Sequence, residues 1–377
     1  MHFTFHLTTG CTMRCDYCYS PPLARLDMTE ETARQAMEFA VTTQPKHSGI
    51  VFYGGEPLLR KDIIRLVVAL AKDAEEKHGH RFHFKLTTNG ILLDEEFLEF
   101  AGCENIAVSL SMDGDARSHD CHRKTADGRG TFSIVDEKAS MLLKWQPYTH
   151  AMMVVTPATL DYFHDSVKFL LEKGFRYILL SLDYRGVWTD NDLRRLRKQY
   201  GLLAKLYERL TLEEHKFYFG PFDVKIAGHI HGAGALCERC HGGVKQVSVA
   251  PDGGLYPCVA FVQDCVSTEE FRIGDVRRGF DDGKRTALFQ RAHAAKESCR
   301  GCAIEERCHS RCGCINWQSA GDIAMVSPVL CETERIVIPV ADRLARRLYR
   351  KKAPMFIQKH YNPAYPVISL LEDLQGL

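Results

Sequence analysis

The first half of the chain alternates short apolar segments with longer segments whose apolar residues recur at helical spacing. Ala33, Ala36, Met37 and Ala40 show this spacing in one long segment, and Thr29 can cap the helix that it predicts. Short apolar runs bounded by turn residues are typical of buried strands. We predict strands over 2–7, 49–53, 81–88, 105–111, 149–155 and 176–182, and helices over 30–43, 58–77, 94–100, 132–145, 160–173 and 190–215.

Six strands that are each followed by a helix predict an α/β fold with a parallel sheet and right-handed crossovers. The periodicity fits a barrel and a flat doubly wound sheet equally well. Both arrangements bind ligands at the carboxyl ends of the strands. The residues that directly follow the strands are therefore the first candidates for a functional site.

Length and charge limit the kinds of partner. The chain has 377 residues, more than one typical domain, and 49 Lys and Arg against 48 Asp and Glu. This balance lacks the basic excess of nucleic-acid-binding proteins. No apolar run approaches the ~20 residues of a membrane span, and residues 1–6 lack the layout of a signal peptide. We therefore expect a cytoplasmic protein without nucleic-acid or membrane partners.

Fifteen cysteines in a cytoplasmic protein indicate metal or redox chemistry rather than disulfides. Cys11, Cys15 and Cys18 follow the first strand, a spacing expected by chance about 0.02 times in this composition. Three thiolates are one fewer than a [4Fe-4S] cluster needs, which leaves one iron open to a small molecule. A zinc site completed by His6 is the alternative.

A second motif, Gly54-Gly55-Glu56-Pro57, directly follows the second strand. Glycines at this place let the backbone approach a neighbouring group closely, and Pro57 suits the start of a helix. By itself the tetrapeptide is also typical of an ordinary strand-to-helix turn. Its occurrence together with the cysteine motif makes it a candidate part of the same site.

The spacing Cys-x3-Cys-x-Tyr17-Cys resembles the signature of the radical S-adenosylmethionine (SAM) enzymes. The resemblance implies a partial (β/α)6 barrel, SAM bound to the open iron, and its reductive cleavage to a 5'-deoxyadenosyl radical. It also implies that Glu56 pairs with the amino group of SAM and that Ser111 contacts its ribose or carboxylate. For Asn89 and Arg123, turn capping and loop ion pairing are equal alternatives. The expected cofactor-binding residues are Tyr17, Gly54, Gly55, Glu56, Asn89, Ser111 and Arg123.

A second set of cysteines begins at Cys237 and ends at Cys331. Its compact part, with the spacing Cys-x2-Cys-x5-Cys-x3-Cys, is strong evidence for metal ligation. Eight thiolates are enough to complete two [4Fe-4S] clusters. A structural zinc ribbon is the alternative reading of the compact part. The eight cysteines are Cys237, Cys240, Cys258, Cys299, Cys302, Cys308, Cys312 and Cys331.

This order resembles the SPASM domain, an auxiliary-cluster module that follows many radical SAM cores. The resemblance implies one cluster on Cys237, Cys240, Cys258 and Cys312, and another on Cys299, Cys302, Cys308 and Cys331. Cys314 could replace Cys312. The implied organisation is a radical SAM core over 1–215, a connector over 216–236, a SPASM domain over 237–335 and a helical tail over 336–377.

The combined resemblance implies an enzyme with SAM and three [4Fe-4S] clusters that modifies a peptide or protein. Installation of a thioether or carbon-carbon crosslink in a ribosomally made peptide is our first expectation. The alternative is formylglycine formation, as in anaerobic sulfatase maturases; these carry an aspartate directly after the cysteine that matches Cys258, where this chain has Val259. Flavodoxin or ferredoxin would donate electrons. Because only ten residues precede Cys11, a separate leader-peptide recognition protein, or the SPASM domain and the tail, would bind the substrate.

Two other classes share parts of the pattern. A small-molecule radical SAM dehydrogenase would use the same core, although such enzymes often have one auxiliary cluster. An iron-sulfur electron carrier would need neither the Gly54–Pro57 motif nor an open iron. No residue can be assigned as the catalytic base from the sequence.

Overall fold

The computed structural model describes residues 1–20, 25–44, 46–232, 241–262 and 269–375. The chain forms two compact units, each built from three separate stretches. Unit 1 comprises Met1–Ser111, His122–Met141 and His241–Ala294, and unit 2 comprises Met112–Cys121, Leu142–Cys240 and Ala295–Leu377. This division follows packing, and the predicted domain boundaries stay a prediction.

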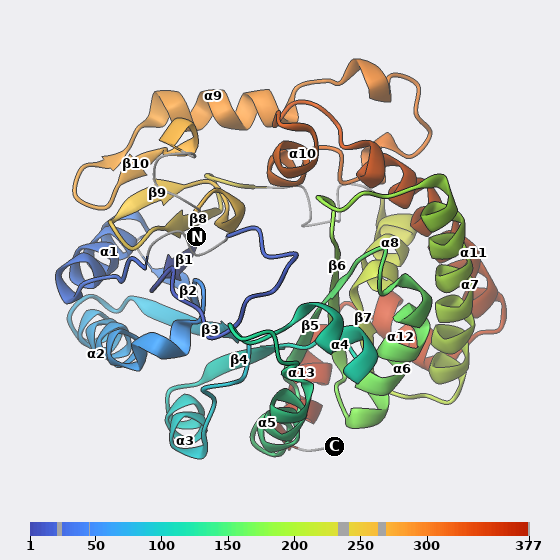
Figure 1. Ribbon diagram of the computed structural model, residues 1–377, viewed down its shortest axis with the longest axis horizontal. Helices are drawn as coiled ribbons and strands as arrows, with labels where there is room; N and C mark the ends of the chain where they lie inside the picture. The colour runs from blue at the N-terminus through green and yellow to red at the C-terminus, as the bar shows by residue number, and fades with distance from the viewer. Residues whose placement is uncertain (21–24, 45, 233–240, 263–268, 376–377) are drawn as a thin grey trace. The chain divides into compact units, whose positions relative to one another are not determined.

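Unit 1 is built on a sheet with the strand order β11-β10-β9-β8-β1-β2-β3-β4 (Figure 1). Neighbours from β8 to β4 run parallel, and β9 to β11 are antiparallel. The predicted parallel α/β architecture is thus confirmed in this unit. The strands are β1 His2–His6, β2 His47–Tyr53, β3 Arg81–Thr88, β4 Ile106–Ser111, β8 Gln246–Val249, β9 Gly254–Tyr256, β10 Gly274–Asp275 and β11 Gly279–Phe280.

Helices cover one face of this sheet. Phe3 and Phe5 on β1, with Ile50 and Phe52 on β2, are fully buried, and Phe3 packs edge to face against Phe39 of α1. Alternate strand residues point to opposite faces. His6 and Tyr53 therefore lie on the face opposite α1. The helices include α1 Glu30–Thr43, α2 Lys61–His78, α3 Glu95–Cys103 and α9 Asp282–His293.

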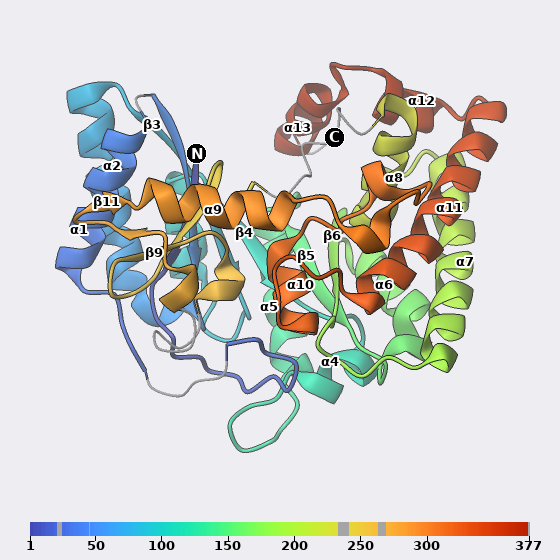
Figure 2. The ribbon, with the colours of Figure 1, turned by 90° about the horizontal axis from the view of Figure 1, so that it is seen from above.

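Unit 2 combines a short parallel sheet with several long helices (Figure 2). Its strands run in the order β5-β6-β7, with β5 at His150–Val155, β6 at Tyr177–Leu182 and β7 at Tyr218–Phe219. Helix α11 packs against α7 and α8. The helices include α6 Phe163–Lys173, α7 Asp190–Leu212, α8 Gly220–His231, α10 Gly313–Ala320, α11 Pro328–Arg350, α12 Pro354–Tyr361 and α13 Tyr365–Gln375.

The six predicted strands are confirmed, with bounds that differ by two residues or fewer. The helix predicted over 58–77 is instead a 3-10 turn at Pro57–Arg60 followed by α2, and a long helix is confirmed at α7. The sequence did not predict the helices at Ala116–His122 (α4), α8, α12 and α13. Helix α5, Phe132–Trp145, has its predicted bounds.

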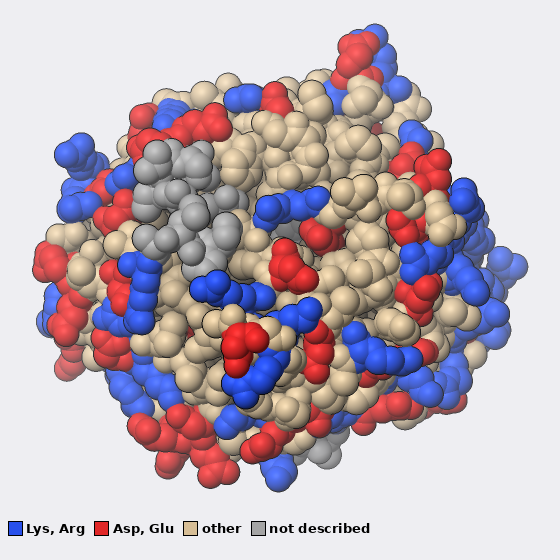
Figure 3. Space-filling view, viewed as in Figure 1, with Lys and Arg blue, Asp and Glu red and all other residues tan. Residues whose placement is uncertain are grey.

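Acidic and basic side chains are intermixed on the face shown in Figure 3, in keeping with the net charge of +1. No helix in the described part of the chain is both long and apolar enough to cross a membrane.

Candidate functional site

The loop from Cys11 to Cys18 leaves the carboxyl end of β1 and is fixed by backbone hydrogen bonds. The N–H of Glu56 donates to the carbonyl of Gly10 at 2.9 Å, and the N–H of Arg14 donates to the carbonyl of Lys124 at 2.7 Å. Met13 anchors the loop in the core with 3% of its surface exposed. The loop is therefore positioned by segments that lie far from it in the sequence.

The three thiols of the loop are exposed or half-buried. Cys11 and Cys18 are exposed and Cys15 is half-buried. Burial raises the pKa of Cys11, and the nearby charges of Glu56 and Cys18 raise it further, whereas hydrogen bonds from Met13 and Asn89 lower it. The first and last thiols of the motif thus lie close enough to interact, as ligands of one cluster would.

A single-ion site is not indicated. Among the described residues, no three His, Cys, Asp or Glu side chains are spaced to hold one metal ion. Zinc would draw its thiolates to ~2.3 Å from a single centre, whereas a four-iron cube spreads them more widely. His6, the alternative fourth zinc ligand, is 4% exposed and packs against the Tyr53 ring. The iron-sulfur cluster on these three thiols stays a prediction.

Gly54 and Gly55 pack directly on the strand that leads into the cysteine loop. A Cβ at Gly54 would lie 2.4 Å from the Thr8 carbonyl oxygen, and one at Gly55 would lie 2.2 Å from that of Gly10. Gly54 also has φ +133°, which L side chains rarely adopt. The N–H of Gly55 donates to the Thr8 carbonyl at 2.9 Å. The two glycines therefore make the expected close approach, and the backbone that they approach lies at the base of the cysteine loop.

Glu56 lies fully buried beneath the same turn. Its Oε1 accepts hydrogen bonds from Leu58 N–H at 3.0 Å and Thr88 Oγ1 at 2.8 Å, and its Oε2 accepts one from Asn89 N–H at 2.8 Å. Burial raises its pKa to about 7, although all three hydrogen bonds act in the opposite direction. The carboxylate therefore joins the end of β3 to the Gly-Gly turn. Pairing with the SAM amino group stays a prediction.

Asn89 extends this connection to the cysteine loop. Its Nδ2 donates to Thr12 Oγ1 at 3.0 Å and lies 3.5 Å from Cys11 Sγ, with 7% of the residue exposed. An amide donor at a cluster sulfur lowers the electron density there. Ser111 ends β4 and is half-buried. Its predicted contact with SAM stays a prediction.

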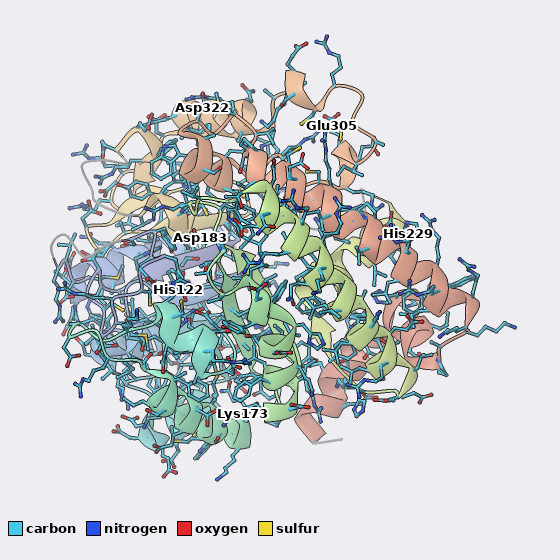
Figure 4. The ribbon with its side chains drawn as sticks, turned by 45° about the vertical axis from the view of Figure 1, so that its right-hand side comes forward. His122, Lys173, Asp183, His229, Glu305 and Asp322 are labelled. Carbon is cyan, nitrogen blue, oxygen red and sulfur yellow. The ribbon has the colours of Figure 1, made fainter. Side chains whose placement is uncertain are left out.

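Tyr17 and Arg123 meet on the other side of the loop. The Arg123 guanidinium is 5.5 Å from the centre of the Tyr17 ring, and Arg123 is 7% exposed. The Tyr17 ring also packs against His122, whose Nδ1 lies 2.9 Å from Asp16 Oδ1. Figure 4 labels His122 at the end of α4. No sequence motif indicated His122, which is notable in the sequence only for its position next to Arg123.

Two tyrosines next to the motifs also meet. Tyr19 directly follows Cys18, Tyr53 directly precedes Gly54, and their hydroxyl oxygens are 3.2 Å apart. Burial raises the pKa of both hydroxyls, and the charges of Cys18 and Cys258 raise it further. Cys258, predicted to ligate the first auxiliary cluster, therefore lies near the radical SAM loop within unit 1. Cys237 and Cys240 lie outside the described residues.

The four cysteines predicted for the second auxiliary cluster are gathered in unit 2. Burial raises the pKa of Cys331, and the charges of Cys299 and Cys302 contribute to the rise. Burial also raises the pKa of Cys308, to about 12, with a contribution from Cys331. Cys331 therefore lies within electrostatic reach of the other three thiols. The sulfur atoms of the two alternative ligands Cys312 and Cys314 are 3.3 Å apart.

A buried charge network borders this second set. Lys225 and Glu334 are 3% and 4% exposed, and Lys225 Nζ lies 2.8 Å from Glu334 Oε2. His309 Nδ1 is 3.1 Å from both Lys225 Nζ and Glu334 Oε1. The charge of Glu334 contributes to the raised pKa of Cys308. The sequence did not reveal this network, although Glu334 follows Cys331 by one helical turn.

Arg307 strengthens the same region. Its guanidinium donates to both oxygens of Asp342, at 2.9 and 2.6 Å, and to the Lys225 carbonyl at 2.9 Å. His229, labelled on α8 in Figure 4, lies 3.4 Å from Asp342. The short turns around Cys299–Cys308 are therefore joined to α11 by an ion pair and to α8 by a hydrogen bond.

Comparison with known proteins defines the class. Residues 5–170 match the family model described as the Radical SAM superfamily. The solved structure of native anSMEcpe with bound AdoMet and the Cp18Cys peptide is similar over 92% of this chain and 99% of that chain, with 21% identity and a TM-score of 0.76. Residues 5–170 therefore carry a radical SAM domain, and the chain shares the fold of this solved structure.

Within the class, the likeness extends along most of the chain. A cysteine-type anaerobic sulfatase-maturating enzyme of Clostridium perfringens is 24% identical over 332 residues, which cover 81% of this chain and 86% of the relative. A serine-type anaerobic sulfatase-maturating enzyme of Bacteroides thetaiotaomicron is 23% identical and covers 93% of this chain and 92% of its own length. Streptococcus suis SuiB bound to its precursor peptide SuiA has a TM-score of 0.57 at 15% identity, over 88% of this chain and 75% of SuiB. The chain is thus similar, along most of its length, to anaerobic sulfatase-maturating enzymes.

Proposed function

We propose that the protein oxidises a cysteine or serine side chain in a protein or peptide substrate to formylglycine. The most direct support is the similarity to a serine-type sulfatase-maturating relative. This similarity covers 93% of this chain and 92% of the relative, so it includes the carboxyl-terminal cysteine region. The alternative that our sequence analysis placed second is therefore better supported than peptide crosslinking.

The described residues offer a site for both cofactors of the core. Cys11, Cys15 and Cys18 would hold a [4Fe-4S] cluster with one open iron, and the turn at Gly54 and Gly55 would line the SAM site. A carboxylate has about four lone-pair sites. Glu56 already accepts three hydrogen bonds, so one site remains for the SAM ammonium.

When bound, SAM and the clusters supply a 5'-deoxyadenosyl radical that removes a substrate hydrogen, and an acceptor for the electron that remains. Met13 and Arg14 hold the cysteine loop in place, and the Asn89 amide lies beside the Cys11 sulfur. Tyr17, stacked on Arg123, would form a wall of the nucleotide site. Ser111 at the end of β4 would contact the ribose or carboxylate of SAM.

Two auxiliary [4Fe-4S] clusters in a SPASM-type region would bring the total to three. The grouping of Cys299, Cys302, Cys308 and Cys331 supports the second of these. The first would use Cys237, Cys240 and Cys258 with Cys312 or Cys314. A flavodoxin or ferredoxin would supply electrons to the core.

Crosslinking of a ribosomally made peptide is a second candidate that one residue favours. Val259 directly follows Cys258 at the start of a 3-10 turn, where sulfatase maturases that this chain resembles carry an aspartate base. A valine cannot accept a proton there. If this candidate holds, a separate leader-peptide recognition protein would present the substrate.

One experiment separates the two candidates. The anaerobically reconstituted, reduced enzyme is incubated with SAM and either a peptide from the modified segment of a sulfatase or a cysteine-rich precursor peptide. Formylglycine formation replaces the cysteine sulfur by an aldehyde oxygen, whereas a thioether crosslink retains sulfur and removes two hydrogens. We expect mass spectrometry to show sulfur loss from the sulfatase peptide. Sulfur retention with loss of two hydrogens from the precursor would establish crosslinking instead.

A further inference from the structure

The face of the unit 1 sheet opposite α1 carries an unusual histidine. His6 ends β1 and pairs in register with Tyr53 of β2. It is 4% exposed, and no described residue forms a hydrogen bond with its Nε2. Buried polar atoms are nearly always hydrogen-bonded, so an exception at the carboxyl end of a strand requires an explanation.

Burial also fixes the charge of this ring. It lowers the pKa of His6 to about 3, so the imidazole is neutral near pH 7. Each neutral imidazole has one nitrogen that donates and one that accepts. An unpartnered Nε2 in a neutral ring can therefore form one hydrogen bond with a group that arrives from outside the protein.

The hydroxyls of two neighbouring tyrosines can form hydrogen bonds with the same arriving group. The His6 ring contacts the Tyr53 ring edge to face, with centres 5.4 Å apart, and the Tyr53 hydroxyl is 3.2 Å from that of Tyr19. A tyrosine hydroxyl has an ordinary pKa of about 10, so both carry their protons near pH 7. The contact between them uses one of these two protons, and among the described residues the other has no acceptor.

The location of the Tyr19–Tyr53 pair also supports a role in substrate binding. The Tyr19–Tyr53 pair is influenced by Cys18 of the radical SAM loop and by Cys258 of the predicted first auxiliary site. In the proposed reaction the substrate residue would give a hydrogen atom to the deoxyadenosyl radical formed at the first site and an electron to an auxiliary cluster, so a position between Cys18 and Cys258 suits it. Val259, beside Cys258, offers no polar group there.

We propose that His6 Nε2 and the Tyr19–Tyr53 hydroxyl pair form the binding position for the thiol or hydroxyl of the substrate residue that is modified. This inference rests on the proposed function and deepens it by naming the residues that hold the side chain to be modified. The thiol or hydroxyl hydrogen donates to Nε2, and its sulfur or oxygen accepts from the tyrosine pair. Substrates with a proton-donating group next to the carbon that loses hydrogen are thereby selected.

The test measures peptide affinity without turnover, on reconstituted enzyme with SAM but no reductant. Fluorescence anisotropy compares a sulfatase-derived peptide that carries cysteine at the target position with its alanine counterpart. His6→Phe keeps a ring but has no nitrogen, and His6→Gln keeps a hydrogen-bond acceptor, its amide oxygen, at a similar reach. His2→Phe, on the same strand face, is the control.

We expect His6→Phe to bind the cysteine peptide about tenfold more weakly than wild type and the alanine peptide equally well, since one hydrogen bond is lost. His6→Gln should recover part of this affinity, and His2→Phe should match wild type. The thermal midpoint of His6→Phe should equal or exceed that of wild type, because removal of an unpartnered buried nitrogen relieves a cost.

The inference would be overturned if His6→Phe bound the cysteine peptide with wild-type affinity, or if the wild type bound the two peptides equally well. Either result would leave the proposed function intact. A wild type that neither binds nor oxidises these peptides would overturn both.

Discussion

The two cysteine sets of this enzyme are held by different means. In unit 1, Cys11, Cys15 and Cys18 lie on one loop that backbone hydrogen bonds, glycine contacts and one buried carboxylate fix from beneath. In unit 2, Cys299, Cys302 and Cys308 lie in short turns, and Cys331 lies in α11. The buried Lys225–Glu334 pair joins α8 to α11, and the half-buried Arg307–Asp342 pair joins these turns to α11.

The difference suits two kinds of cluster. A loop that supplies three thiols from one side leaves an iron open, whereas turns and a helix that supply four thiols close the cluster. A site with an open position binds and activates a ligand, and a closed one serves structure or electron transfer. The following predictions test this contrast, beginning with the largest expected effect.

Cys15→Ala should abolish SAM cleavage, because a cluster with two thiolates is not retained at the first site. Iron content should fall by about four atoms of about twelve, since each complete cluster contributes four. Iron assay and chromatographic detection of 5'-deoxyadenosine test this. Cys103→Ala, at an exposed thiol at the end of α3, should change neither. Retained cleavage by Cys15→Ala would refute the assignment of the loop.

Lys225→Met should destabilise unit 2 by about 3–5 kcal/mol, because it leaves the buried Glu334 carboxylate without its cation. The second site should lose iron while 5'-deoxyadenosine formation continues. Denaturant unfolding and iron assay measure both effects. Lys225→Met combined with Glu334→Leu should recover most of the stability. Arg300→Met breaks an exposed ion pair and should cost under about 0.5 kcal/mol.

Glu56 should make the stability of unit 1 depend on pH. Its folded pKa of about 7 exceeds the usual 4.5, so the folded state binds the extra proton between these values. Its contribution is therefore fully present below pH 4.5 and is lost as pH rises through 7, with a total on the order of 3 kcal/mol. Glu56→Gln, which cannot ionise, should remove this dependence from unfolding curves. An unchanged slope in the variant would exclude Glu56 as its source.

Gly55→Ala should destabilise the base of the cysteine loop by about 1–3 kcal/mol, because the new methyl would overlap the Gly10 carbonyl. Iron at the first site should fall and iron at the second should persist. Gly102→Ala is a matched control in α3, where a Cβ meets no atom within 4 Å. This control should stabilise by up to about 1 kcal/mol. Equal effects of the two substitutions would argue against the close packing of the turn.

The sequence predicted the strands and the first cysteine loop well because both depend on local signals. Alternating apolar residues define β1 to β6, and three closely spaced thiols identify the loop. It could not predict that Gly55 packs against Gly10 or that Glu56 is buried, because these contacts join residues that are distant along the chain.

Helix α8 was missed for a similar reason. Its glycine- and aromatic-rich sequence indicated a connector, but packing against α11 and the buried Lys225–Glu334 pair stabilise a helix there. The unpartnered nitrogen of His6 was also invisible, because it becomes notable only when the neighbours of a buried side chain are known.

The open iron of the first site is the claim on which the proposed chemistry depends. Electron-nuclear double resonance of the reduced enzyme with SAM labelled by ¹⁵N at the amino group measures it directly. We predict a ¹⁵N coupling to the cluster spin that Cys15→Ala abolishes. A wild-type spectrum without ¹⁵N coupling, while the reduced cluster is present, would contradict the account.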